Sequence, residues 1–217
     1  MGLLVVTPDI SYPHEVLSTP AREESATRFE VFVAGCSLCV KDSYSVATLP
    51  MGVSGPSGFG PSVVSTMARG GAVRFEVVRA YPPAKQSQQI FVMRATLLIK
   101  AGDGQLSPVA TGLLDDEEVT ALATAVAEIS KRPSPRKAEE LAPDMSEIEF
   151  HGGSLRFGVI RIKGAEVAYI QAGDLRSLRP PSALETTHAL FLPVSDLPAL
   201  HEVIGQVERR IRELRGQ

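Results

Sequence analysis

The sequence has no tryptophan, and only 6% of its 217 residues are aromatic, so few rings are present to stack on nucleobases. No apolar run approaches the roughly 18 residues of a membrane-spanning helix. The apolar start from Met1 to Val6 has no basic residue before it, unlike a secretory signal peptide. We therefore expect a cytoplasmic protein that makes no contact with a membrane.

Cysteine is nearly absent, since Cys36 and Cys39 are the only two. A zinc site needs a second pair of ligands, and the four histidines show no spacing that would supply one. The pair lies in the stretch from Arg28 to Lys41, whose alternating apolar residues predict a strand. Residues three apart in a strand point to opposite faces, which favours a buried structural role over the alternative zinc or dithiol roles.

Excess charge of one sign is also lacking. The 22 Lys and Arg residues face 25 Asp and Glu residues, which gives a net charge of −3. The chain as a whole therefore does not attract phosphate, and nucleic-acid binding would need a local basic face. Apolar residues at 44% and charged residues at 22% indicate a globular chain with a hydrophobic core.

Two stretches, Val109 to Ile129 and Thr187 to Val207, share one pattern. Each has a short apolar strand, an acidic or Ser/Asp helix start, and then an apolar stripe spaced by three, four and three residues. The two stripes are Val119, Leu122, Val126 and Ile129, and Leu197, Leu200, Ile204 and Val207. The repeat predicts two amphipathic helices that cover sheets, and it favours a pseudo-symmetric binding or assembly surface over a single catalytic cleft.

Several β-like segments precede each of these helices. We therefore predict an α+β fold in which two β-β-β-β-α modules pack as an intramolecular pseudo-dimer. The predicted organisation is an N-terminal arm at 1–26, a first module at 27–132, a linker at 133–146 and a second module at 147–217. Prolines and interleaved charges after Lys131 mark the linker.

No set of residues points to catalysis, so we expect a protein that is not an enzyme and that binds no cofactor or metal. The Gly/Pro/Ser-rich segment 49–72 contains neither a phosphate-binding loop nor a nucleophile elbow. An enzyme that uses this segment as a lid is the least favoured alternative.

Basic residues and a few tyrosines lie on or beside the predicted strands. They suggest a track for phosphates with tyrosines that stack on bases, and an ordinary polar sheet face is the alternative. The predicted nucleic-acid-binding residues are Arg74, Arg79, Tyr81, Arg94, Arg156, Arg161, Lys163, Tyr169 and Arg176.

The C-terminal helix keeps its apolar spacing of three and four residues to the end. A narrow seam of this kind favours either a partner helix, in a homodimer or another protein, or the chain's own other module. The predicted interaction seam is Leu200, Ile204, Val207, Ile211 and Leu214.

The strands Gly158 to Arg161 and Val167 to Ile170, followed by His188 to Leu200, resemble a PUR repeat or a Whirly-type domain. The match is strongest from Ala189 to Ile211. These families are built from β-β-β-β-α modules that dimerise or duplicate and bind single-stranded DNA or RNA. The resemblance implies a single-stranded nucleic-acid-binding protein. A protein-interaction or assembly module without nucleic-acid binding is the alternative.

Overall fold

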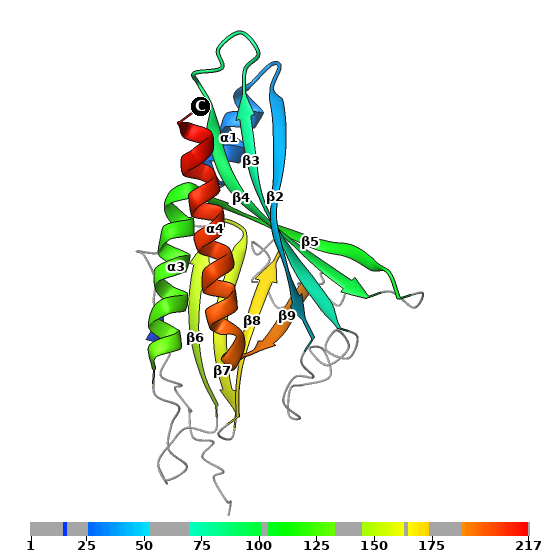
Figure 1. Cartoon of the computed structure of the whole chain (residues 1–217), viewed down its shortest axis with the longest axis vertical. Helices are drawn as coiled ribbons and strands as arrows, with labels where there is room; N and C mark the ends of the chain where they lie inside the picture. The colour runs from blue at the N-terminus through cyan, green and yellow to red at the C-terminus, as the bar shows by residue number, and fades with distance from the viewer. Residues whose placement is uncertain are drawn as a thin grey trace, which may run out of the picture.

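The computed structural model describes residues 15–16, 26–52, 70–100, 104–132, 145–162, 165–173 and 188–216, and it shows an α+β fold (Figure 1). The helices are α1 (Arg28–Gly35), α3 (Asp116–Lys131) and α4 (Leu197–Arg215), with the 3-10 turn η1 (Val194–Asp196) before α4. No helix in these ranges is both long and apolar enough to cross a membrane.

The first sheet is an antiparallel meander whose strands follow one another in sequence order. Its strands are β2 (Val40–Met51), β3 (Gly71–Tyr81), β4 (Ile90–Lys100) and β5 (Leu106–Asp115). Alternation along β3 explains its two faces: Val73 and Phe75 are buried in the core, whereas Arg74 and Glu76 point to the opposite side.

The second sheet is also an antiparallel meander in sequence order. Its strands are β6 (Met145–Gly152), β7 (Leu155–Ile162), β8 (Ala165–Ala172) and β9 (His188–Pro193). The short strand β1 (Glu15–Val16) adds to β6 in parallel. The β6–β7 turn needs glycine because Gly153 has a φ of 47°, and a Cβ there would lie 2.1 Å from the carbonyl oxygen of Leu113.

Helices α3 and α4 lie side by side, and each contacts the sheet that belongs to the other half of the chain (Figure 1). Helix α4 packs on β2 and β3 of the first sheet. Helix α3 contacts β6 of the second sheet in addition to β4 and β5. A capping box between Asp115 and Glu118 begins α3, and a proline in the first turn begins α4.

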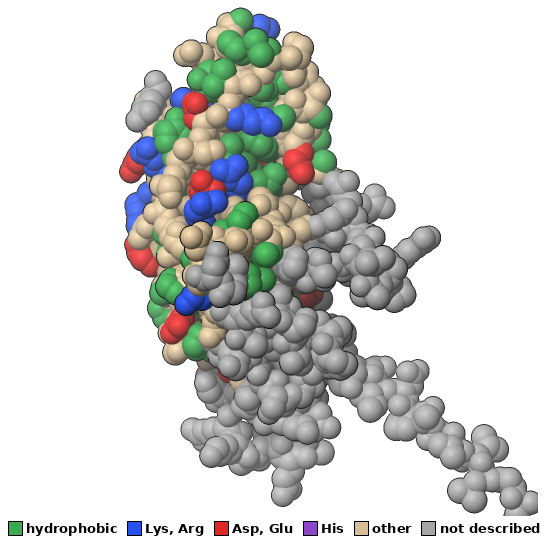
Figure 2. All heavy atoms as spheres, turned by 90° about the vertical axis from the view of Figure 1, so that its right-hand side faces the viewer, with side chains coloured by type: hydrophobic (Ala, Val, Ile, Leu, Met, Phe, Trp, Pro, Cys, Tyr) green, Lys and Arg blue, Asp and Glu red, His purple; other side chains and the backbone are tan. Residues whose placement is uncertain are grey.

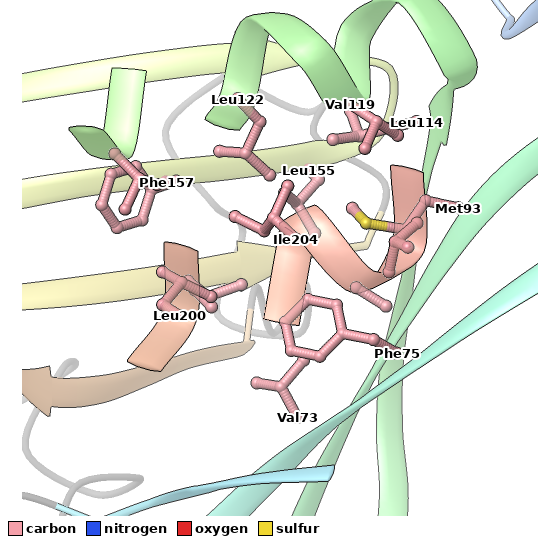
Figure 3. Close-up of a cluster of buried hydrophobic side chains, with 14 of the residues drawn as sticks. Val73, Phe75, Met93, Leu114, Val119, Leu122, Leu155, Phe157, Leu200 and Ile204 are labelled. Atoms are coloured by element: carbon pink, nitrogen blue, oxygen red, sulfur yellow. The ribbon is translucent and has the colours of Figure 1, made fainter. Parts of the chain in front are cut away.

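One hydrophobic core joins both sheets and both long helices (Figure 3). Its largest buried side chains include Phe75 and Met93 from the first sheet and Phe157 from the second. The predicted core positions are confirmed, since Leu122, Val126, Leu200 and Ile204 are all buried. The two halves of the chain therefore bury their apolar surface against each other.

The strand predicted from Arg28 to Lys41 is wrong over most of its length, because α1 occupies residues 28–35. Thr27 and Glu30 form a capping box that begins this helix. The Asp115 carboxylate also accepts hydrogen bonds from the backbone N–H groups of Arg28 (2.7 Å) and Phe29 (3.3 Å). These bonds satisfy helix-terminal donors, which favours the helix over the strand.

The prediction that the two cysteines are buried is also wrong. Cys36 and Cys39 form a disulfide in the turn between α1 and β2, where both residues are partly exposed.

The predicted linker and the Gly/Pro/Ser-rich segment fall mostly outside the described residues, which resume at 70 and at 145. Of the predicted N-terminal arm, residues 15–16 form β1 and residue 26 is described beside α1.

Candidate nucleic-acid interface

The structure describes seven of the nine predicted nucleic-acid-binding residues and places them in four separate areas. Arg74 and Arg94 lie on the outer side of the first sheet, and Arg79 and Tyr81 lie on its other side. Arg156 and Tyr169 share the outer side of the second sheet, whereas Arg161 points to the opposite side. Lys163 and Arg176 lie outside the described residues. The predicted residues therefore do not form one track.

The side of the first sheet that faces away from α4 carries a group of cations and hydroxyl groups among apolar side chains. We call it the outer basic face. Its register brings these side chains together from all four strands: Lys41, Ser43, Ser45, Thr48, Arg74, Glu76, Arg94, Thr96, Lys100 and Thr111. Four of them are Lys or Arg and one is Glu, so this face is positive although the chain as a whole is negative.

Glu76 lies between the two arginines at the centre of the outer basic face. Its Oε2 is 3.0 Å from Arg94 Nε and 3.6 Å from Arg74 Nε, and Arg94 Nη2 donates a hydrogen bond to Ser43 Oγ at 3.1 Å. The Nε of Arg74 is buried and has no hydrogen-bond partner. One carboxylate thus faces two guanidinium groups, which leaves an excess of one positive charge.

The two lysines lie beside this centre. Both Lys41 and Lys100 are exposed, and neither forms an ion pair with another described residue. Helix α1 covers the adjacent part of the same side, where Phe29 packs with Val78 and Val92. The side chains of Arg74 and Arg94, beside the part under α1, are 43% and 33% exposed.

Arg79 and Tyr81 belong to a different cluster, which lies beside α4. Arg79 Nη2 is 2.5 Å from Asp42 Oδ2, and its guanidinium carbon lies 4.8 Å from the ring centre of Tyr81 and 5.8 Å from that of Tyr44. The hydrogen bond to Asp42 is the main cause that raises the pKa of Arg79. Arg210 of α4 lies over the other side of this cluster, 5.1 Å from the ring centre of Tyr44. The cluster ties β2 and β3 to α4, and Arg79 already has an anionic partner.

Tyr169 lies in a hydrogen-bonded network on the outer side of the second sheet. Its hydroxyl contacts Glu147 Oε1 at 2.8 Å and also Glu149 Oε1, and the second oxygen of Glu149 lies 2.6 Å from His151 Nε2. The ring passes over Gly158, where a Cβ would lie 2.6 Å from it. Because Tyr169 is only 4% exposed, it is not placed to stack on a base.

The electrostatics of this network follow from burial and pairing. Burial raises the pKa of Tyr169 far above its ordinary value, and the charges of Glu147 and Glu149 add to the shift. Burial alone would raise the pKa of Glu149, but hydrogen bonds from His151 and Tyr169 bring it below the ordinary value.

Arg161 has a carboxylate partner, since its Nη2 lies 2.8 Å from Glu166 Oε1. Arg156 lies directly across from His151 on β6 and Gln171 on β8, and its Nε is buried without a hydrogen-bond partner. In the described part of the surface seen in Figure 2, Lys and Arg side chains are interspersed with Asp and Glu side chains.

The predicted interaction seam is covered within the chain. Its five members are at most 4% exposed, and they lie in the core between α3 and the two sheets: Leu200, Ile204, Val207, Ile211 and Leu214. The seam was expected to pack on either a partner helix or the chain's own other module. In the structure it packs on the chain's own other module.

The sequence reasoning missed Lys41 and Ser43 as members of the outer basic face. The signal for both was the alternation from Lys41 to Ser45, in which exposed polar residues alternate with partly buried ones along β2.

No protein-family model matches the chain, and no curated protein matches its sequence.

Proposed function

We propose that the chain binds single-stranded nucleic acid through the outer basic face. The observation that carries this proposal is the composition of the face, with four cations, one carboxylate and several exposed hydroxyl groups on one side of the first sheet. Lys and Arg neutralise phosphates, and Ser and Thr hydroxyl groups donate to phosphate oxygens. The ligand contacts fall on β2, β3 and β4, with Arg74 and Arg94 at their centre.

The proposal includes the finer description of the fold, two β-β-β-β-α modules packed as an intramolecular pseudo-dimer. Three features support it: both sheets are meanders in sequence order, a long helix follows each sheet, and each helix contacts the sheet of the other half. The resemblance to PUR and Whirly-type domains implies the same arrangement and a single-stranded ligand.

In this proposal Glu76 orients the two arginines before the ligand arrives. A bound phosphate contacts the exposed end of Arg74, whose side chain is 43% exposed, and shares Arg94 with Glu76, so the arginines do not have to be ordered during binding. Lys41 and Lys100 supply further positive charge beside the two arginines. Binding through such contacts releases counterions and therefore weakens as salt increases.

The test compares two variants that each lose four positive charges. The face variant changes Lys41, Arg74, Arg94 and Lys100 to Ala, and the control variant changes Lys131, Arg132, Arg209 and Arg212 to Ala on α3 and α4. Fluorescence anisotropy with a labelled single-stranded oligonucleotide should show at least about tenfold weaker binding for the face variant, with a shallower dependence on salt. The control variant should bind nearly as the wild type does. Equal losses in both variants would show that only net charge matters and would contradict the assignment of this face.

A protein-assembly function is the second candidate, and the edge of the first sheet favours it. Strand β2 is 12 residues long and lies at the end of the strand order, so one of its edges offers backbone groups to an added strand. Ser45→Lys with Thr48→Lys separates the two functions. Added charge on an edge strand hinders strand addition, whereas the same charge on the outer basic face strengthens phosphate binding.

A further inference from the structure

The Cys36–Cys39 disulfide lies on the surface, at the point where α1 ends and the chain turns into β2. Cys36 is the C-cap residue of α1, and its backbone N–H donates to the Val33 carbonyl at 3.2 Å. Both cysteines are partly exposed, and the bridge closes a segment of only four residues. A bridge in this position can be reached by a reductant without opening the core.

The disulfide is not needed to hold its neighbours in place. The start of α1 is fixed by the Thr27–Glu30 capping box, by hydrogen bonds to Asp115 and by the burial of Phe29. Strand β2 is fixed by its ladder with β3. In the chain-entropy model, stabilisation by a disulfide grows with the length of the closed loop, so a four-residue loop gives little. The bridge therefore contributes little to the stability of the fold.

Exposed apolar side chains accompany the bridge. Among the described residues, the large hydrophobic side chains that are exposed are Val31 at 61%, Leu38 at 69% and Leu106 at 47%. Leu38 lies between the two cysteines, and Val31 lies on the helix that leads to them, whereas Leu106 lies at the start of β5. Exposed apolar groups beside a reactive site are suited to contact with another protein.

We propose that Cys36–Cys39 is a thiol–disulfide exchange site that accepts electrons from a protein dithiol. A thiolate of the reductant attacks one sulfur, the Cys36–Cys39 bond breaks, and the other cysteine leaves as a thiolate and takes up a proton. The second thiol of the reductant then attacks the mixed disulfide. It releases the first cysteine as a thiol and leaves the reductant as a disulfide. Two electrons and two protons pass to this chain in total.

The geometry indicates which sulfur is attacked. Cys36 lies at the carbonyl end of α1, and its Sγ is 3.0 Å from the carbonyl oxygen of Leu38, so a thiolate there is disfavoured. The cysteine that forms the more stable thiolate is the better leaving group, which is Cys39. The reductant thus attacks Cys36, and the mixed disulfide forms on Cys36. This inference does not rest on nucleic-acid binding.

The test uses the folded, oxidised full chain. Glutathione and reduced thioredoxin serve as the small-thiol and protein-dithiol probes. Samples are quenched with a maleimide, labelled cysteines are counted by mass spectrometry, and far-UV circular dichroism follows the fold. We expect both probes to reduce the bridge without denaturant and without loss of helix and sheet signal. Reduction that occurs only in denaturant, or that unfolds the chain, would overturn the proposal and make the bridge structural.

Three variants test the details. Val31→Ser with Leu38→Ser should slow reduction by thioredoxin severalfold but leave reduction by glutathione unchanged, and Leu106→Ser should affect neither. After an adduct has formed on the remaining cysteine of each single variant, reduced glutathione should release Cys36 in Cys39→Ser more slowly than it releases Cys39 in Cys36→Ser, because the Cys36 thiolate is the poorer leaving group. If Leu106→Ser slowed reduction by thioredoxin as much as the Val31→Ser, Leu38→Ser variant does, this would contradict a docking contact at Val31 and Leu38. Faster release of Cys36 than of Cys39 would contradict the assignment of Cys36.

Discussion

Single side chains of the second sheet show how its outer side is ordered. Tyr169 crosses Gly158 and contacts Glu147 and Glu149 on β6, and Glu149 also contacts His151. Sequence placed Tyr169 correctly on a strand but not in this network. The alternation of a strand tells which residues share a face, whereas their burial and partners depend on the neighbouring strands.

The first residue-scale prediction concerns Tyr169→Phe. Loss of a hydroxyl that contacts two carboxylates should lower the free energy of unfolding by about 2 kcal/mol at neutral pH. Because the pKa of Tyr169 is raised in the folded state, its contribution is present below about pH 10, the ordinary value, and is lost as the pH rises toward the folded value. Urea unfolding at increasing alkaline pH should therefore show a steeper loss of stability in the wild type than in the variant. Parallel curves would contradict the role of this hydroxyl.

The second concerns the β6–β7 turn. Gly153→Ala should destabilise the chain by about 1–3 kcal/mol, since φ is 47° and the new Cβ would meet the Leu113 carbonyl oxygen. Gly205→Ala in α4 is the matched control, because the new Cβ would lie 3.6 Å from Arg209 Nη1, an ordinary contact distance, and alanine favours a helix. Denaturant unfolding should show a lower free energy of unfolding for Gly153→Ala and a higher one for Gly205→Ala, each relative to the wild type. A neutral Gly153→Ala would mean that the turn does not need glycine.

At the scale of elements, the long helices were predictable and the first helix was not. In α3 and α4 the spacing of three and four residues, together with helix-start residues, agrees with every local signal. In α1 the alternation of Phe29, Val31 and Val33 fits a strand, but Phe29 and Val33 also share a helix face. The capping box and the hydrogen bond to Asp115, which is distant in sequence, stabilise the helix over the strand.

Strand β2 was missed for a related reason. The predicted strand ended at Lys41, two residues into the observed one, because alternation with Ser43 and Ser45 gives little apolar signal. As a consequence, most of the outer basic face could not be predicted. Arg74 and Arg94 were chosen as basic strand residues, and the register of the sheet adds Lys41 and the hydroxyl groups.

The element-scale prediction concerns α4. Leu200→Ala should lower the free energy of unfolding by about 2–5 kcal/mol, because Leu200 is 1% exposed in the shared core. Arg212→Ala on the exposed side of the same helix should change it by less than about 0.5 kcal/mol. Chemical denaturation of both variants gives the comparison. An unchanged midpoint for Leu200→Ala would show that the stripe is not covered in solution.

At the scale of the whole molecule, the two halves of the chain share one core. Both sheets and both long helices contribute to this core, and each helix contacts the sheet of the other half, so neither half buries its own apolar surface alone. The sequence predicted two similar modules, but the exchange of helix contacts depends on distant residues and has no local signal.

This sharing predicts that the halves do not fold separately. Fragments 26–132 and 145–217 should each lack a cooperative thermal transition, whereas the intact chain should unfold in one transition. Circular dichroism of each fragment and of their mixture checks this. Independent cooperative folding of either fragment would contradict the shared core.

The most direct measurement is an anisotropy titration of the wild-type chain with labelled single-stranded DNA, single-stranded RNA and duplex DNA at increasing salt. We predict binding to single strands at low salt and weaker binding to duplex. A plot of the logarithm of the association constant against the logarithm of the salt concentration should have a slope of about −2 to −3, as expected for three or four phosphate contacts. No binding to any of these oligonucleotides at the lowest salt, or binding that does not change with salt, would contradict nucleic-acid recognition by the outer basic face.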